Sequence, residues 1–131
     1  MRYMLDTNIV SELIRNPAGP AAQRARAAGN AVCVSIIVAA ELRHGCAKKG
    51  SPRLSSKVKD FLAKVPVLPF DVPADGEYGS LRAELEASGR VIGSNDLLIA
   101  AHACALGATV VTASVSEFRR VRGLSVENWL A

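Results

Sequence analysis

The sequence has little of what an extracellular or membrane protein needs. Its 131 residues include only three cysteines, and the odd number and unpaired spacing of Cys33, Cys46 and Cys104 favour buried, reduced thiols. No apolar stretch reaches the roughly 20 residues that span a bilayer. The charge of Asp6 comes too early for the apolar core of a signal peptide. We therefore expect a soluble, cytoplasmic protein with no membrane attachment.

Aromatic residues are also scarce, at 5% of the chain, so a platform for stacking nucleic-acid bases is not indicated. His44 lies near Cys46 and His102 near Cys104, but no Cys-x-x-Cys or helical His-x-x-x-His accompanies them, which argues against zinc. The formal net charge of +4 permits a polyanionic partner without requiring one. Linkers, repeats and low-complexity segments are missing, so we expect one domain over residues 1–131.

Half of the residues are hydrophobic, which is enough for a sizeable core. Expected strands cover residues 2–5, 32–35, 67–70, 109–112 and an edge strand at 124–126. Expected helices cover residues 7–15, 20–28, 36–49, 52–64, 74–88 and 94–105, with a loop at 113–116. Short apolar strands thus alternate with helices. This pattern predicts an α/β fold, a single domain with a short central parallel β-sheet flanked by helices on both faces.

Four acidic residues fall near the ends of these strands. Asp6 directly follows the first strand, and Glu41 lies in the second turn of the helix after the second strand. Asp96 lies in the first turn of the helix that begins at Ser94, and Glu117 follows the 109–112 strand by a short loop. Because ligands bind beyond the carboxyl ends of parallel strands, we expect the four carboxylates to converge there.

Each acid also has a simpler structural explanation. Asp6 is a good cap for the helix after it. Asp96 can complement the dipole of its helix behind a Ser94 cap, and Glu117 can be an ordinary loop charge. Glu41 is more informative, because it lies beside an apolar helix face, where an ionised carboxylate is costly unless it is paired or bound to a cation. An ion pair with a distant arginine is the alternative explanation for it.

Together, the acids point to a cation. Clustered carboxylates raise one another's pKa, and a divalent cation removes this penalty. Oxygen ligands without Cys or His favour Mg²⁺ or Mn²⁺. Such an ion can bind a phosphate oxygen, lower the pKa of a bound water and orient that water for attack. The acids therefore indicate metal-dependent hydrolysis of a phosphodiester.

Neutral and basic residues flank the acids in the sequence. The residues that can orient water or ligands, or simply cap helices, are Thr7, Asn8, Ser94 and Asn95. The residues that can hold an RNA backbone by charge, or form a solvated basic loop, are Arg119, Arg120 and Arg122.

At these positions the sequence resembles PIN-domain proteins. The segments that carry the resemblance are Met4–Ile9, Ala39–Gly45, Ser94–Ala103 and Val111–Trp129. The last segment, with its Glu-Phe pair at 117–118, is similar to the closing segment of the VapC toxins. Because the four segments follow in the family's order over nearly the whole chain, the sequence resembles the VapC family of PIN-domain ribonuclease toxins, from type II toxin–antitoxin systems.

The resemblance implies a PIN domain with Mg²⁺- or Mn²⁺-dependent endoribonuclease activity, inhibited by a cognate VapB-type antitoxin. It implies an RNA substrate, often tRNA in this family, and a homodimer. It also implies that Asp6, Glu41 and Asp96 are the three core metal-binding acids and that Glu117 is an additional one. Ser114 stands where many relatives carry Asn or Asp, so a second metal position is either in doubt or left to Glu117 alone.

Three other functions fit parts of the pattern. A phosphoacceptor receiver domain needs an acidic pair after the first strand and a late lysine, but Asp6 is solitary and no lysine follows residue 64. A dinucleotide enzyme needs a Gly-x-Gly-x-x-Gly turn, which is missing. A non-catalytic PIN-fold module that binds RNA or protein is favoured only by Ser114. Metal-dependent RNA cleavage would separate that module from a nuclease.

Overall fold

The computed structural model describes residues 1–130. Its elements, in chain order, are β1 (Tyr3–Leu5), α1 (Thr7–Arg15), α2 (Pro20–Ala28), the 3₁₀ turn η1 (Gly29–Ala31), β2 (Val32–Ser35), α3 (Ile36–Lys49), α4 (Pro52–Lys64), β3 (Val67–Leu68), α5 (Ala74–Ala87), α6 (Ser94–Leu106), β4 (Thr109–Val111), α7 (Val115–Phe118) and β5 (Val126–Glu127).

The five strands form one parallel sheet in the order β3-β2-β1-β4-β5. The chain begins at the centre, moves outward through β2 and β3, and then returns to the other side of β1. The strand order therefore reverses between β1 and β4, which is where open α/β sheets bind ligands. Leu5 pairs with Val111, so Asp6 and Thr112 leave the sheet beside each other.

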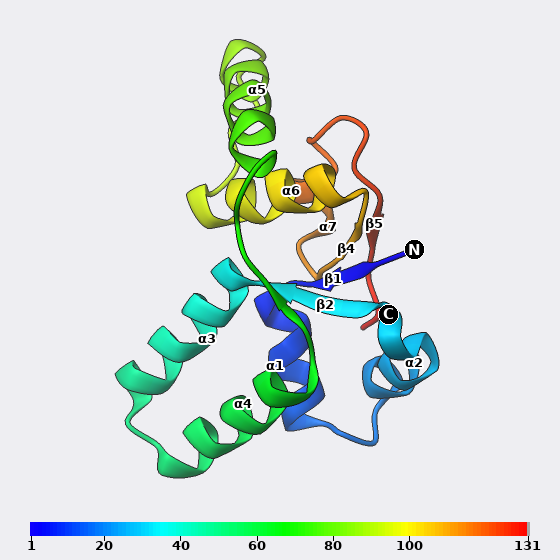
Figure 1. The fold of residues 1–131 in the computed structure, drawn as a ribbon, viewed down its shortest axis with the longest axis vertical. Coiled ribbons are helices and arrows are strands. Elements are labelled where there is room, and N and C mark those ends of the chain that lie inside the picture. The colour runs from blue at the N-terminus through cyan, green and yellow to red at the C-terminus, as the bar shows by residue number, and fades with distance from the viewer. Residues whose placement is uncertain (131) are drawn as a thin grey trace.

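Helices cover both faces of the sheet, as predicted. In Figure 1, α5 and α6 lie on one side of the strands, and α1, α3 and α4 lie on the other. The central strands are apolar and buried on both faces, since Met4, Leu5, Val34, Val110 and Val111 have no exposed surface. No helix within residues 1–130 is long and apolar enough to cross a membrane.

Most predicted boundaries are confirmed, and the exceptions are few. The strand expected at 67–70 ends at Leu68, because Pro69 lacks the N–H that a strand needs. The edge strand forms at Val126–Glu127 rather than 124–126. The loop expected at 113–116 gives way to the short helix α7, which the fully buried ring of Phe118 anchors to the core. The three cysteines are free thiols, with Cys104 only half-buried.

Candidate active site

Asp6 lies at the carboxyl end of β1 and is only 4% exposed. Its Oδ1 accepts the backbone N–H of Thr7 at 2.8 Å, so Asp6 caps α1 as predicted. Its Oδ2 accepts the Thr112 hydroxyl at 2.7 Å and the Asn8 side-chain amide at 3.3 Å. These three donors fix the carboxylate and leave it lone-pair capacity for a further partner.

Glu41 reaches the same region from α3. Its Oε1 accepts the Thr7 hydroxyl at 2.5 Å, and its Oε2 accepts the Asn95 side-chain amide at 3.1 Å. The ion pairs among residues 1–130 do not include Glu41. The alternative of a distant arginine partner is therefore wrong, and the half-buried Glu41 carboxylate is held by neutral donors alone.

Asp96 and Glu117 meet beside the backbone of Gly93. Glu117 Oε1 accepts the Gly93 N–H at 2.6 Å. A Cβ atom added at Gly93 would lie 3.4 Å from Glu117 Oε1 and 3.8 Å from Asp96 Oδ2. The absence of a side chain at residue 93 therefore leaves room for both carboxylates.

The four carboxylates perturb one another. Burial is the main cause that raises the pKa of Asp96, to about 7. Repulsion from Asp6, Glu117 and Glu41, and a hydrogen bond with Glu117, raise it further in the same direction. Burial also raises the pKa of Asp6, with Glu41 adding repulsion against the lowering effect of its hydrogen bonds. Within residues 1–130 none of these four acids has an arginine or lysine partner. Asp96 thus lies near enough to the other three acids for their charges to act on it.

Thr112 was missed by the sequence reasoning, which treated it as the last residue of a strand. It is fully buried, donates to Asp6 Oδ2 and accepts the Ser114 N–H at 2.9 Å. Asn8 completes this network by accepting the Ala113 N–H at 3.1 Å and reaching the Ser114 hydroxyl at 3.5 Å. The available signal was register, since a residue that directly follows β4 must lie beside one that directly follows β1.

Residues 3–124 match the family model described as PIN domain. The chain belongs to the PIN-domain family. It is 42% identical to ribonuclease VapC2 of Rickettsia felis, with 98% of each chain covered. It is 35% identical to the tRNA(fMet)-specific endonuclease VapC of Shigella flexneri, again with 98% of each covered. Within the PIN-domain family, the chain is therefore of the VapC ribonuclease type.

A solved structure supports the same assignment. The crystal structure of VapBC2 from Rickettsia felis bound to a DNA fragment from their promoter contains a chain that matches this one with a TM-score of 0.90. The two chains are 39% identical, and the match covers 98% of this chain and 99% of that one. The predicted PIN-like α/β fold is thereby confirmed.

The remaining predicted site residues of this PIN domain differ in what they contact. Ser94 is the exposed first residue of α6, and the cap position belongs to Gly93, which has no capping side chain, so the predicted Ser94 cap is wrong. Arg120 donates to the Val91 carbonyl at 2.8 Å, and Arg122 pairs with Glu84 at 3.0 Å. The Arg119 side chain is exposed and makes no hydrogen bond or ion pair with residues 1–130.

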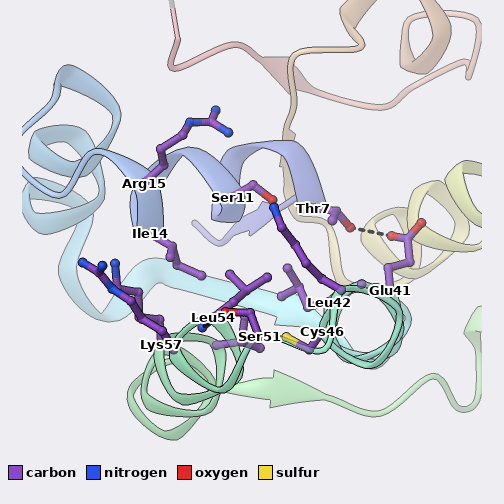
Figure 2. A pocket seen from close by; sticks show the side chains of 14 residues that line it. Thr7, Ser11, Ile14, Arg15, Glu41, Leu42, Cys46, Ser51, Leu54 and Lys57 are labelled. Carbon is purple, nitrogen blue, oxygen red and sulfur yellow. Dashed lines mark hydrogen bonds between the residues drawn. The ribbon is translucent and has the colours of Figure 1, made fainter.

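A groove of about 520 Å³ opens beside Glu41, between α1, α3 and α4. Figure 2 shows the Thr7–Glu41 hydrogen bond at one end of it. The apolar lining residues are Ile14, Leu42, Cys46, Leu54 and Val58. The basic ones are Arg15, Lys49, Arg53 and Lys57. The groove of this PIN domain therefore combines apolar walls with positive charge and reaches the Glu41 carboxylate.

The chemistry of the acids suits a divalent cation, because four carboxylates without a basic partner form a hard, anionic donor set. Within residues 1–130, however, no three acidic, histidine or cysteine side chains are close enough together to hold a metal ion as they stand. Glu41 and Glu117 are directed to the neutral donors of Thr7, Asn95 and Gly93 instead. The donor types fit such an ion, although the glutamates contact other groups.

Proposed function

We propose that this chain is the toxin of a type II toxin–antitoxin pair and a Mg²⁺- or Mn²⁺-dependent endoribonuclease. In this proposal Asp6, Glu41 and Asp96 bind the cation, and Glu117 is an additional ligand. One observation carries it: four acids from separate segments lie near the switch point of the sheet without a basic partner, and burial together with repulsion from the other three raises the pKa of Asp96 to about 7. PIN-domain nucleases depend on divalent metals, which supports the assignment.

The four acids differ in how firmly their present hydrogen bonds hold them. Asp6 is held by three donors and is the rigid member of the set. Glu41 and Glu117 are longer side chains on neutral donors, so each can rotate toward a cation at the cost of exposed or half-buried hydrogen bonds. Asp96 holds a proton over part of the neutral range and must release it to act as a ligand. When bound, the cation supplies Lewis-acid activation of phosphate and water.

The proposed substrate is RNA, with tRNA as the first candidate. Relatives at 35% identity include a protein named as a tRNA(fMet)-specific endonuclease, and the net charge of +4 is compatible with a polyanion. We assign contact with the RNA backbone to residues 119–122, where Arg119 is the arginine whose side chain has no hydrogen-bond or ion-pair partner within residues 1–130. Ser94, Asn95 and Ser114 are proposed to orient water or ligands around the acids. An RNA substrate of this kind places the action in the cytoplasm.

The proposed partner is a VapB-type antitoxin. The solved structures similar to this chain include VapBC complexes, which supports such a partner. The groove between α1, α3 and α4 suits an antitoxin segment that carries apolar and acidic side chains, because its walls are apolar and four basic residues line it. A homodimer is proposed on the family resemblance alone.

The direct test is metal-dependent cleavage of tRNA by the purified chain and by Asp6→Ala. The wild type should cut with Mg²⁺ or Mn²⁺, stop on addition of EDTA and recover when the ion is restored. Asp6→Ala should lose cleavage and growth toxicity while keeping its circular dichroism spectrum. Tight RNA binding without cleavage in any of these ions would favour the non-catalytic module instead.

A further inference from the structure

Five polar or charged side chains are buried among residues 1–130, namely Asp6, Ser35, His102, Thr109 and Thr112. Asp6 and Thr112 bond each other within the candidate active site. Ser35 and His102 form a second pair, with His102 Nδ1 2.8 Å from Ser35 Oγ. Ser35 is 0% and His102 is 2% exposed, and the proposed chemistry uses neither side chain. A fully buried polar pair of this kind needs an explanation.

The hydrogen bonds of this pair determine how the imidazole is protonated. Ser35 Oγ accepts the Ile37 N–H at 3.1 Å as the cap of α3, which leaves its hydroxyl proton for His102 Nδ1. A backbone hydrogen bond at Pro69 also acts on the ring, and the Phe70 ring packs against it in a T-shaped arrangement with 5.5 Å between ring centres. Burial lowers the pKa of His102 in spite of nearby Asp71, which favours the neutral ring. A neutral ring that accepts the Ser35 proton at Nδ1 carries its own proton on Nε2. Every polar atom of the pair then has a partner.

Ser35 and His102 lie equally far, in residues, from the acids carried by the two helices that they connect. Ser35 precedes Glu41 by six residues at the start of α3, and Asp96 precedes His102 by six residues on α6. The two helices make one more polar contact near the acids, from Asn95 to Glu41 at 3.1 Å. The residue numbers rise along α3 in the direction in which they fall along α6, so the two contacts lie along one helix–helix interface. The Ser35–His102 contact is buried and the Asn95–Glu41 contact is exposed.

We propose that the Ser35–His102 hydrogen bond fixes α3 against α6 and thereby positions Glu41 opposite Asp96. At a rise of 1.5 Å per residue, about 9 Å of rigid helix separates each acid from the buried pair. A slip of one residue along either helix would move an acid by about 1.5 Å, and displacements near 1 Å already slow catalysis about a hundredfold. Ser35 and His102 are thus positioning residues for the proposed metal site, and the inference rests on the proposed function.

Two amide variants test the hydrogen bond between His102 and Ser35. His102→Asn places an amide oxygen near the position of Nδ1 and keeps the Ser35 contact, whereas His102→Gln places its amide near the position of Nε2 and loses that contact. We expect His102→Gln to bind Mn²⁺ about tenfold more weakly and to lower kcat with little change in KM, because a shift of α6 against α3 moves Asp96 relative to Glu41, and a displacement near 1 Å can cost about a hundredfold. His102→Asn should recover most of both values.

Mn²⁺ affinity is measured by calorimetry and cleavage by single-turnover kinetics, with Leu85→Ala, a buried truncation in α5, as the control for general destabilisation. Equal Mn²⁺ affinity in His102→Gln and wild type, or equal losses in His102→Gln and Leu85→Ala, would overturn the inference. Should His102→Gln fail to fold, Ser35→Ala takes its place, with the same expected weakening of Mn²⁺ binding. Wild-type Mn²⁺ affinity in Ser35→Ala would then overturn the inference. Asp6→Ala is included because retained Mn²⁺ binding and cleavage in that variant would refute the proposed function itself.

Discussion

Replacing Asp96 by asparagine should stabilise the metal-free protein while removing RNA cleavage. The carboxylate of Asp96 is half-buried near Asp6, Glu117 and Glu41, and its pKa rises from an ordinary value of 3.8 to about 7. At 1.36 kcal/mol per pH unit, that rise corresponds to about 4 kcal/mol of destabilisation at high pH. Because solvent screens a half-buried group, we expect about 1–2 kcal/mol. For a domain of this size that is about 4–8 °C in Tm.

The pH dependence follows from the direction of this shift. A carboxyl group whose pKa is higher in the folded state takes up a proton on folding, so its penalty is complete above about pH 7. The penalty shrinks as the pH falls from 7 toward 4, and it is lost below the unfolded-state pKa of 3.8, where Asp96 is protonated in both states. The stability gain of Asp96→Asn should therefore be largest at pH 8 and much smaller at pH 5. Mn²⁺ should stabilise the wild type at pH 8 and have little effect on the variant.

The assay is denaturant unfolding in EDTA at several pH values, followed by circular dichroism. Asp60→Asn is the matched control, since it makes the same chemical change at an exposed position on α4. It should leave the free energy of unfolding unchanged at every pH. If Asp96→Asn were no more stable than wild type at pH 8, or if its gain did not diminish on acidification, the idea that the acids repel one another in a shared site would be wrong.

Three further predictions concern residues around the site. Thr112→Val keeps the shape of the side chain but removes the 2.7 Å hydrogen bond to Asp6. Mn²⁺ affinity, measured by calorimetry, should fall about tenfold or more. An unchanged affinity would count against a role for Thr112 in holding Asp6. Arg119→Gln should reduce the slope of RNA affinity against salt by about one, measured by fluorescence anisotropy, whereas Arg122→Gln should affect it less because Arg122 pairs with Glu84. Trp129→Ala should lower the free energy of unfolding by about 3–5 kcal/mol, measured with denaturant, since the indole is 2% exposed and packs on Tyr3 with 5.3 Å between ring centres. A decrease below about 1 kcal/mol would show that the closing segment is not part of the core.

Local signals in the sequence determined most of the secondary structure and identified the four acids as candidate site residues. Helical periodicity, the Ser51-Pro52 start of α4 and the Gly50 and Gly107 stops of α3 and α6 are short-range effects, so the predicted ranges agree closely with the structure. The acids were identified because each follows a strand, or begins or lies near the start of a helix, in a predictable α/β alternation. The helix α7 was missed because it depends on Phe118 reaching a core whose residues lie far away in the sequence, which no local pattern reports.

The partners of each polar side chain were decided only by the tertiary structure. Thr112 lies 106 residues from Asp6, and His102 lies 67 residues from Ser35, so neither hydrogen bond leaves a signal in local spacing. Sequence could state that carboxylates gather at the carboxyl ends of parallel strands, because chain direction and strand alternation fix that edge. Which neutral donor holds each acid, and that no arginine reaches Glu41, depend on the register of β1 with β4 and on how α3 lies against α6.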